Sequence, residues 1–500
     1  MVQTSGKLLD IFIIGGGING TGIANDAAGR GLSVGLCEQG DLAGATSSAS
    51  SKLIHGGLRY LEHREFRLVG EALKEREILL RKAPHIIWPL RFILPHRSHL
   101  RPAWMIRAGL FLYDHLGKRK TLPGSRGVRF GSDSPLKPEM MRGFEYSDCW
   151  VDDARLVVLN ALQAHEAGAE ILVRTRCTHA REDNGIWRIE LEDVRSGERF
   201  ERRARALVNA AGPWVEQVVR EQAARPSRYS IRMIQGSHLV VPRLNTDERA
   251  YILQNGDRRI VFVLPYEDDF SLVGTTDRRY QGDPAKVGIS DEEVDYLLGV
   301  ANEHFRRQLD RSDVIASFSG VRPLCDDESA DPSAMTRDYT LALDTSGVPL
   351  LSVYGGKITT YRKLAEAALR QLAYAFPVMG ASWTAKTALP GGDIGSQADF
   401  LAQLMQDYPW LEEQRARRYA RSYGTLCLRF LEGAGSADDL GEEFGAGLTA
   451  AETDYLIDHE WAHSSEDILW RRTKLGLRLT PRQVERLTQH IEAHRQAMAA

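Results

Sequence analysis

The chain has 500 residues, of which 43% are hydrophobic and 26% charged, so its composition excludes disorder as the main state. Its 64 Lys and Arg nearly cancel its 67 Asp and Glu, and with this balance we expect no nucleic-acid partner. The five scattered cysteines form neither a zinc-type spacing nor a disulfide framework, which predicts a reducing compartment and no metal site. This length predicts two or three domains.

The N-terminal apolar run, residues 8–14, does not predict a secretion signal. It is interrupted by Asp10 and leads into three glycines without a small-residue cleavage site. No uninterrupted apolar stretch reaches the ~18 residues that a membrane-spanning helix needs. We therefore expect no transmembrane helix.

A glycine motif follows this run and carries the strongest signal in the sequence. The pattern predicts a buried strand, a helix and a second strand at residues 8–14, 19–30 and 33–37. Gly15, Gly17 and Gly20 have the spacing of a dinucleotide-binding turn, in which glycine lets the backbone approach a pyrophosphate. Glu38 ends the second strand, where a carboxylate can bind the ribose hydroxyls of adenosine. Together these features predict a dinucleotide site.

The loop at residues 41–52 favours FAD over NAD. It is rich in small and hydroxyl-bearing residues, which suits a backbone that wraps around an extended cofactor. An NAD-binding domain usually reaches its third strand sooner, and mixed strand patterns come later in this chain.

Several further motifs resemble the FAD-dependent glycerol-3-phosphate dehydrogenases, the quinone-linked respiratory enzymes. These motifs lie at residues 15–22, 45–51, 52–62, 143–155, 207–214, 274–277, 319–324 and 355–361. The resemblance covers nearly the whole chain and implies oxidation of sn-glycerol 3-phosphate to dihydroxyacetone phosphate. It also implies ubiquinone or menaquinone as electron acceptor and a place on the cytoplasmic face of the inner (plasma) membrane, and it leaves a homodimer open.

The expected fold class is mixed α/β, with a Rossmann-like FAD-binding domain, an antiparallel-sheet substrate cap and an all-helical C-terminal domain. The FAD-binding domain is expected at residues 1–75, 151–225 and 346–388. Residues 76–150 are expected to form a cap or membrane-facing segment, residues 226–345 the substrate cap and residues 389–500 the C-terminal domain.

Periodicity predicts the individual elements of these domains. In the FAD-binding domain we expect a helix at 152–168 and strands at 170–175, 187–191, 199–204, 206–214 and 350–353. In the cap we expect strands at 237–241, 259–266 and 270–274 and a helix at 291–309. In the C-terminal domain we expect helices that begin near 397, 411, 450, 465 and 481.

Candidate cofactor-binding residues cluster in the glycine motif, the hydroxyl-rich loop and two later turns. They are Gly15, Gly17, Asn19, Gly20, Glu38, Thr46, Ser47, Ser51, Lys52, Gly212, Gly356, Lys357 and Thr359. The turn at 356–360 presents backbone N–H groups and the positive end of a helix dipole, which favour a reduced, anionic flavin.

Candidate substrate-binding residues are cations that suit a phosphate and hydroxyls that add contacts. They are Arg59, Tyr60, Thr276, Arg322, Arg337 and Lys357. We expect Arg322 at a strand end, where Pro323 would stop the ladder.

His55 is the candidate general base, because its unperturbed pKa lies near 6.5. A histidine that binds flavin or backbone without moving a proton is an equal alternative. In a third option, Arg322 or Lys357 polarises the hydroxyl and water takes the proton, so the three catalytic candidates are His55, Arg322 and Lys357.

Residues 91–130 contain nine basic residues and one acid, which is typical of an interfacial segment on an anionic membrane surface. Apolar residues interleave with them: Trp104, Met105, Ile106, Leu110, Phe111, Leu112 and Tyr113. The alternative is a core helix with a solvated basic face.

Two other functions remain open at this point. A related FAD oxidase would act on an amine or amino acid, and a flavin-binding scaffold would have no turnover. The C-terminal part, with twelve acids and five bases between 401 and 460, shows no catalytic constellation; we expect it to pack on the core or to bind a partner subunit.

Overall fold

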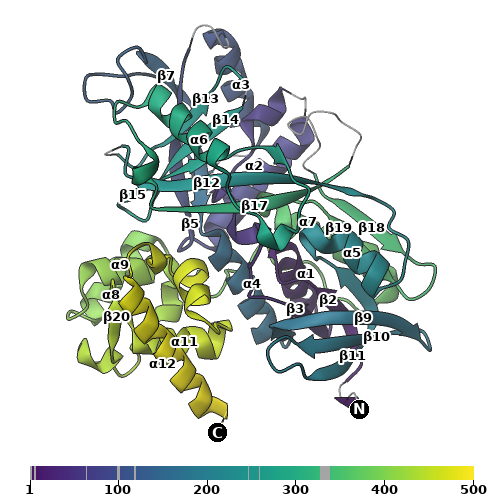
Figure 1. Cartoon of the computed structure of the whole chain (residues 1–500). Coiled ribbons are helices and arrows are strands. Elements are labelled where there is room, and N and C mark those ends of the chain that lie inside the picture. Colours follow the sequence, from purple (N-terminus) through teal and green to yellow (C-terminus); the bar gives the residue numbers. More distant parts are fainter. Residues whose placement is uncertain are drawn as a thin grey trace.

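The computed structural model describes residues 3–4, 7–62, 65–97, 102–117, 120–245, 247–257, 259–326 and 338–499. Figure 1 shows three bodies: a cap domain at the top, a dinucleotide-binding domain at the lower right and a C-terminal domain, in green and yellow, at the lower left. The three-part architecture expected from the sequence is confirmed.

A mostly parallel sheet forms the centre of the dinucleotide-binding domain, in the order β18-β19-β11-β2-β3-β8. The edge strand β18 runs antiparallel to β19, and the side branch of β10 (Ile186–Asp193) and β9 (Thr175–Asp183) joins β11 in antiparallel pairing. The strands are β2 (Leu9–Ile14), β3 (Val34–Glu38), β8 (Glu170–Val173), β11 (Arg199–Asn209), β18 (Thr340–Asp344) and β19 (Leu350–Tyr354). Helices α1 (Ile18–Gly29), α4 (Asp153–Glu166) and α7 (Tyr361–Leu372) pack beside one another on this sheet. The N-cap Asp152 accepts a hydrogen bond from the backbone of Arg155, which satisfies one of the free N–H groups at the start of α4.

Two strand predictions in this domain were wrong in their bounds. The expected strands at 199–204 and 206–214 are one continuous strand, β11, that pairs with β10 (Ile186–Asp193) in its first half and with β2 and β19 in its second. The expected strand at 170–175 divides at Arg174, whose φ of 58° turns the chain into β9 (Thr175–Asp183). A change of partner along one strand leaves no mark in the hydrophobic pattern.

The cap domain is built on a second sheet, antiparallel except where β13 runs parallel to β5. Its strands are β4 (Leu53–Ile54), β5 (Ile87–Pro95), β6 (Arg126–Arg129), β7 (Arg142–Val151), β12 (Ile231–Pro242), β13 (Ala250–Gln254), β14 (Ile260–Tyr266), β15 (Phe270–Gly274), β16 (Arg278–Arg279) and β17 (Ala316–Cys325). The three strands expected from the sequence are β12, β14 and β15. The others come partly from residues 76–150, so that segment contributes to the cap sheet itself.

β7 escaped prediction as a strand because its interior carries polar side chains. Glu145, Ser147 and Asp148 are buried and satisfied by ion pairs and hydrogen bonds, for example between Asp148 and Arg76. A strand with polar residues on a buried face shows no clean alternation. The boundary expected at 75/76 also falls inside helix α2 (Phe66–Lys82).

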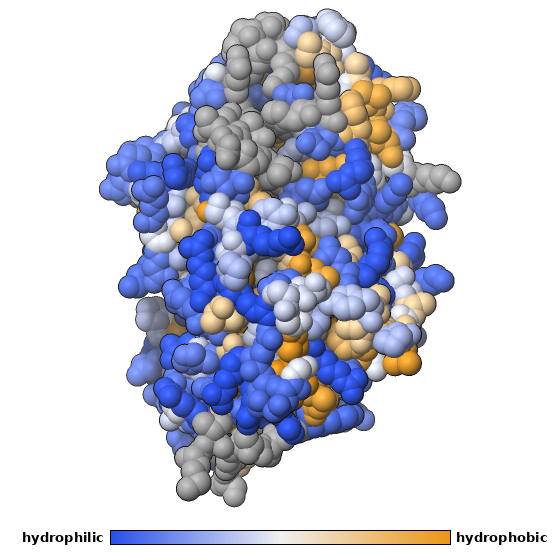
Figure 2. Space-filling model, turned by 90° about the vertical axis from the view of Figure 1, so that its right-hand side faces the viewer, coloured by the Kyte–Doolittle hydropathy of each residue, from blue (hydrophilic) through white to orange (hydrophobic). Residues whose placement is uncertain are grey.

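Helix α3 (Ala103–Leu116) projects from the cap and exposes one apolar face. Ile106, Leu110 and Tyr113 are buried on its inner side, whereas Trp104 and Phe111 are 71% and 60% exposed on the other. Figure 2 shows hydrophobic residues gathered near the top of the molecule, the end where Figure 1 places α3. The apolar residues of this helix are therefore divided between a buried face and an exposed face.

Two details of the cap differ from expectation. Pro323 does not stop a ladder, because β17 continues through it to Cys325; β17 lies at an edge beside β12, where the missing N–H of a proline is tolerated. The helix expected at 291–309 is α6 (Asp291–His304), which begins at a Ser290–Glu293 capping box and ends where Phe305 turns into the core.

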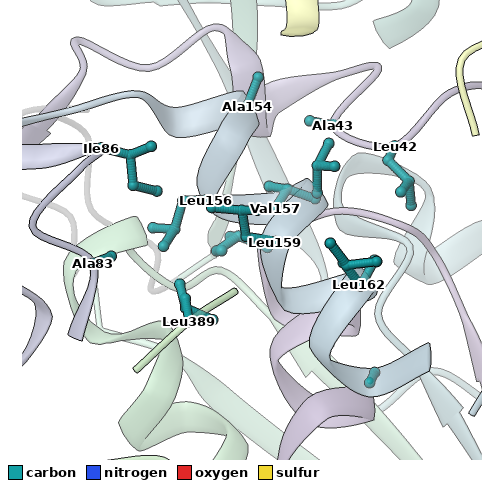
Figure 3. Close-up of a cluster of buried hydrophobic side chains, with 14 of the residues drawn as sticks. Leu42, Ala43, Ala83, Ile86, Ala154, Leu156, Val157, Leu159, Leu162 and Leu389 are labelled. Atoms are coloured by element: carbon teal, nitrogen blue, oxygen red, sulfur yellow. The ribbon is translucent and has the colours of Figure 1, made fainter. Parts of the chain in front are cut away.

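The main hydrophobic core surrounds α4 and joins the domains (Figure 3). Leu156 and Leu159 of α4 pack near Ile86, which precedes β5, and near Leu389 at the start of the C-terminal domain. Burying one such side chain contributes about 1.5–3 kcal/mol relative to leaving it exposed. The C-terminal domain therefore shares a core with the rest of the chain.

The C-terminal domain is mainly helical, with α8 (Gln397–Asp407), α9 (Glu413–Ser422), α10 (Leu428–Leu431), α11 (Ala450–Glu460) and α12 (Pro481–Ala499). The helix expected near 465 is a π-helix, Asp467–Arg472. The domain is not purely helical, because β20 (Glu443–Gly445) pairs with β21 (Leu448–Thr449). Ala446, in the turn between these strands, has a positive φ. Among the described residues, no helix is both long and apolar enough to cross a membrane.

Candidate functional site

A cavity of about 1400 Å³ opens at the carboxyl ends of the parallel strands. Its walls come from the turn after β2, the loop after β3, the start of β9, the segment after β11, strand β17 and the turn after β19, and one wall comes from the C-terminal domain. Ligands of open α/β sheets bind at this edge.

The glycine turn gives the cavity a floor that side chains would obstruct. Gly15 has a φ of 116°, and a Cβ there would lie 2.5 Å from the Ala210 carbonyl oxygen. A Cβ at Gly20 would lie 1.9 Å from the Gly15 oxygen, so helix α1 packs on the strand only with glycine. Gly17 is the N-cap of α1 and has no side-chain cap, which leaves the helix N-terminus to a ligand.

Glu38 joins the glycine turn to the next loop. Its Oε2 accepts a hydrogen bond from Gly16 N at 2.7 Å, and its Oε1 accepts one from Gly40 N at 2.7 Å. Burial raises the pKa of this carboxyl group, while the two backbone donors lower it. A carboxylate has about four acceptor positions, so two remain for hydroxyl groups such as those of a ribose.

The hydroxyl-rich loop divides into a cavity-lining half and a structural half. Thr46 and Ser47 line the cavity; Thr46 Oγ1 donates to Val321 O at 2.6 Å, and Ser47 Oγ accepts from Ile18 N at 3.0 Å. Lys52 is instead buried, with its Nζ 2.7 Å from Asp153 Oδ1 and 3.0 Å from Ser48 O. Lys52 therefore holds the loop in place.

The turn after β19 closes the opposite wall. Asn19 Nδ2 donates to Gly355 O at 3.1 Å, whereas the buried Asn19 Oδ1 has no hydrogen-bond partner among the described residues. Gly356 has a φ of 103°, and a Cβ there would lie 3.1 Å from the Asn19 side chain. Gly212 lines the cavity nearby. Asn19 Oδ1 can accept a hydrogen bond, and the glycine backbone leaves room for a ligand. This wall therefore suits a bound group that carries N–H donors.

Two predicted catalytic residues meet next to this turn. Lys357 Nζ lies 3.6 Å from the centroid of the Tyr60 ring, and His55 N donates to Thr359 Oγ1 at 3.3 Å. The His55 ring lies edge-on to Phe262 with 6.4 Å between centroids. The structure thus brings His55, Tyr60, Lys357 and Thr359 together, just beyond the cavity-lining Gly356.

The third, Arg322, lies on β17 between the cavity-lining residues Val321 and Pro323. Its guanidinium pairs with Asp277 and donates to Thr275 Oγ1 at 2.9 Å. His238 on β12 is a neighbour that sequence reasoning missed, since nothing in its strand pattern marks it. Burial and the nearby Arg322 charge hold the pKa of His238 well below its usual value, so its ring is neutral.

His238 also connects the hydroxyl-rich loop to strand β17. Its Nε2 lies 2.9 Å from Ser51 Oγ, and its ring stacks on the cavity-lining Phe318 at 4.9 Å. Its Nδ1 is buried and has no hydrogen-bond partner within the described part of the chain. Ser51 thus faces His238 and contacts the cavity wall through it.

Of the remaining predicted substrate residues, Thr276 lies beside Arg322, whose Nη1 donates to the Thr276 carbonyl oxygen at 3.4 Å. Thr276 is buried and donates to Glu293 Oε1 at 2.6 Å, which anchors the strand end to α6. Arg337 lies outside the described residues. Arg59 lies in the turn Leu58–Leu61, and its side chain also falls outside the description.

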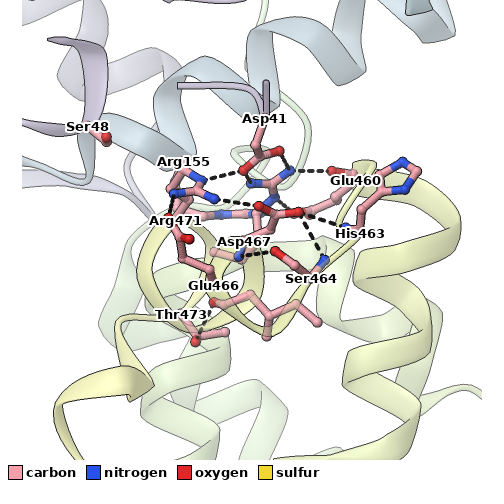
Figure 4. Close-up of polar contacts among 12 residues, drawn as sticks. Asp41, Ser48, Arg155, Glu460, His463, Ser464, Glu466, Asp467, Arg471 and Thr473 are labelled. Carbon is pink, nitrogen blue, oxygen red and sulfur yellow. Dashed lines mark hydrogen bonds and ion pairs between the residues drawn. The ribbon is translucent and has the colours of Figure 1, made fainter. Parts of the chain in front are cut away.

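The C-terminal domain supplies a cavity wall that the sequence did not predict. Arg471, Glu466 and His463 line the cavity, and Arg471 Nε lies 2.5 Å from Asp41 Oδ2 (Figure 4). These contacts join residues more than 400 positions apart. No local pattern could have revealed them.

Comparisons with known proteins agree on one family. Residues 10–362 match the family described as "FAD dependent oxidoreductase", and residues 382–498 match "C-terminal domain of alpha-glycerophosphate oxidase". A glycerol-3-phosphate dehydrogenase of Pseudomonas aeruginosa is 63% identical over 97% of this chain and 96% of its own. The aerobic glycerol-3-phosphate dehydrogenase of Escherichia coli is 59% identical over 97% and 98%. A D-erythritol 1-phosphate dehydrogenase of Brucella abortus is 52% identical over 94% and 95%.

Solved structures show the same architecture. The glycerol-3-phosphate dehydrogenase of Bacillus halodurans, complexed with FAD, aligns with a TM-score of 0.75 at 27% identity, over 98% of this chain and 95% of its own. Glycine oxidase of Geobacillus kaustophilus aligns with a TM-score of 0.56 at 20% identity, over 77% and 99%, which shows a shared fold alone.

Proposed function

The chain belongs to the FAD-dependent oxidoreductase family, among the glycerol-3-phosphate dehydrogenases. We propose that it oxidises sn-glycerol 3-phosphate to dihydroxyacetone phosphate. We propose further that it passes the electrons to a membrane quinone. The observation that carries the proposal is that two cations and one imidazole lie next to residues that line the cavity: Lys357 follows Gly356, Arg322 lies between Val321 and Pro323, and His238 stacks on Phe318. The second imidazole belongs to His55, whose backbone N contacts Thr359 in the turn after β19. FAD, when bound, supplies the hydride acceptor.

The cations suit the phosphate end of this substrate. Arg322 offers a planar set of donors, of which two are already oriented by Asp277 and Thr275. Lys357 offers a point charge that Tyr60 holds in position. Gly355 and Pro323 lie in contact, since a Cβ at Gly355 would be 3.5 Å from the Pro323 oxygen, so both cations adjoin the same wall.

Oxidation of the secondary alcohol removes a hydride from C2 and a proton from its hydroxyl group. The protein has to orient that carbon and accept that proton. His55 and the neutral His238 are the two candidate proton acceptors in the cluster. His55 packs edge-on against Phe262, and His238 stacks on Phe318. We assign the proton to one of these imidazoles and expect only the true base to change the pH dependence of kcat when it is replaced by Ala.

The test is an anaerobic titration of the oxidised holoenzyme with glycerol 3-phosphate. Bleaching of the flavin absorbance, with dihydroxyacetone phosphate formed in equal amount, supports the proposal. No bleaching would leave a flavin-binding scaffold as the better interpretation. Arg322→Ala is expected to raise KM and lower kcat while FAD stays bound.

A second candidate substrate is a longer polyol phosphate, favoured by the relative named for D-erythritol 1-phosphate. A parallel titration with that compound separates the two substrates. The oxidation of an amine or amino acid rests only on a shared fold. Glycine in the same titration tests it.

We further propose that the protein sits on the cytoplasmic face of the inner (plasma) membrane through α3. The outward apolar residues Trp104, Met105, Phe111 and Leu112 form a compact group, and Arg107 lies on the same helix. Several other basic residues of the segment are already paired, as Arg91 and Arg126 are with Glu145. The apolar face of α3 therefore supports the proposal more than the charge count does. A quinone dissolved in the bilayer would be reached from this position.

A further inference from the structure

Asp41 is a buried carboxylate on the wall of the cofactor cavity, and its charge is neutralised from the C-terminal domain. It is 2% exposed and lies in the loop that follows β3. Its Oδ1 accepts from Arg472 at 2.8 Å, and its Oδ2 accepts from Arg472 at 2.7 Å and from Arg471 at 2.5 Å. Two arginines thus meet one carboxylate across a domain boundary.

Arg471 and Arg472 are the last two residues of the π-helix Asp467–Arg472, a type of turn that is frequent at functional sites. Arg472 is fully buried and also donates to Glu460 O at 2.7 Å. Glu460 in turn pairs with Arg155 on α4, so the network is fixed at both ends.

A second contact holds the same turn against the start of β9. Arg174 donates to both oxygens of Asp467, at 2.7 and 2.8 Å. Asp467 also accepts from the backbone of His463 and Ser464 (Figure 4). Although burial raises the pKa of Asp467, these cations and donors lower it to about 2. The turn is thereby locked to two cavity walls.

Asp41 is also tied to the part of the site that receives a pyrophosphate. Ala43 N donates to Gly16 O at 3.1 Å, and Arg174 N donates to Gly40 O at 3.1 Å, so the loop touches the glycine turn on one side and β9 on the other. A buried carboxylate without a partner would repel an anionic cofactor and favour opening of the loop. The arginines remove both effects.

We propose that the C-terminal domain is part of the FAD site: Arg471 and Arg472 hold Asp41 and its loop against the glycine turn, and this contact strengthens the binding of FAD. Arg471 and Arg472 act as positioning residues, since they work through Asp41.

The test measures FAD affinity of the full-length protein, without any turnover. Arg472→Met keeps much of the volume but leaves Asp41 with fewer donors, and we expect the Kd for FAD to rise at least about tenfold. Arg471→Met, at a less buried position, is the second variant and guards against misfolding of the first. Arg472→Lys retains the charge but cannot form both bonds, so we expect an intermediate Kd.

Arg418→Met is the matched control, because Arg418 makes a similar paired contact with the buried Glu452 inside the C-terminal domain. It should lower the melting temperature and leave the Kd for FAD unchanged. Hydrogen exchange of residues 41–49 should accelerate in Arg472→Met and in Arg471→Met, and stay at the wild-type rate in Arg418→Met. Wild-type FAD affinity in both Arg471→Met and Arg472→Met, or an equal loss of FAD in Arg418→Met, would overturn the proposal.

Discussion

Lys357 Nζ lies 3.6 Å from the centroid of the Tyr60 ring, so a cation after β19 rests on an aromatic face from the turn that follows β4. A cation–π contact of this kind contributes about 0.5–2 kcal/mol, and it orients the ammonium group without cancelling its charge. The contact links the flavin-side turn to the loop that carries His55. It therefore orients, at the junction of two domains, the charge that we propose binds the substrate.

Replacing Lys357 by Met should cost activity and spare the cofactor. Loss of a charge-assisted contact of about 1.5–3 kcal/mol lowers kcat/KM roughly 10- to 150-fold. Steady-state rates with glycerol 3-phosphate and a dye acceptor, together with the FAD content, measure the effect. Tyr60→Phe keeps the ring and should retain far more activity than Tyr60→Ala. The exposed Lys386→Met is the control; if it matched Lys357→Met, the effect would be one of overall charge.

Two helical glycines should respond in opposite ways to alanine. A Cβ at Gly20 would lie 1.9 Å from the Gly15 oxygen, a backbone atom that cannot move away, so Gly20→Ala should release FAD and lower the melting temperature. A Cβ at Gly299 in α6 would meet nothing within 4 Å, so Gly299→Ala should stabilise the protein by up to about 1 kcal/mol. The flavin-to-protein absorbance ratio and thermal melts measure both. Full FAD occupancy in Gly20→Ala would contradict this account of the turn.

Three contacts show what a sequence can and cannot reveal. The close approach of Gly20 to Gly15 was predictable because the two residues lie within one turn, so their spacing encodes it, although the contact of Gly15 with Ala210 is remote in the chain. Lys357 was predictable only through a motif shared with a known family, since its partner Tyr60 is remote in the chain. The contact between Asp41 and Arg472 spans 431 positions, and neither residue stands in a motif. Long-range pairs of common charged residues leave no local pattern.

Lys82 should make the stability of the protein depend on pH. Burial, reinforced by the charge of Arg362, lowers the pKa of Lys82 to about 7 from its ordinary value of 10.5. Between these two values the unfolded chain binds more protons than the folded one, so the free energy of unfolding rises with pH in this window. Below pH 7 Lys82 is charged in both states, and the folded protein carries the full cost of burying that charge.

Lys82→Met should therefore raise the melting temperature, more at pH 6 than at pH 9. The variant loses a hydrogen bond from Nζ to Thr387 O at 3.1 Å, worth about 1 kcal/mol, which reduces the gain. Thermal melts of the holoenzyme from pH 6 to pH 10 measure it. The exposed Lys386→Met should keep the wild-type slope. An unchanged slope in Lys82→Met would show that other groups set the pH dependence.

Binding of the protein to anionic vesicles should depend on the outward face of α3. Trp104 and Phe111 are 71% and 60% exposed, and their insertion into the lipid interface removes apolar area from water. Trp104→Ser/Phe111→Ser should stay in the supernatant when sucrose-loaded phosphatidylglycerol vesicles are sedimented at low salt, while the wild-type protein pellets. The control Val378→Ser removes a side chain that is 91% exposed elsewhere and should pellet like the wild type. Anaerobic bleaching of the flavin by glycerol 3-phosphate should be unaffected in both variants. If Trp104→Ser/Phe111→Ser pelleted fully, α3 would not be the anchor, and the quinone would have to be reached from another surface.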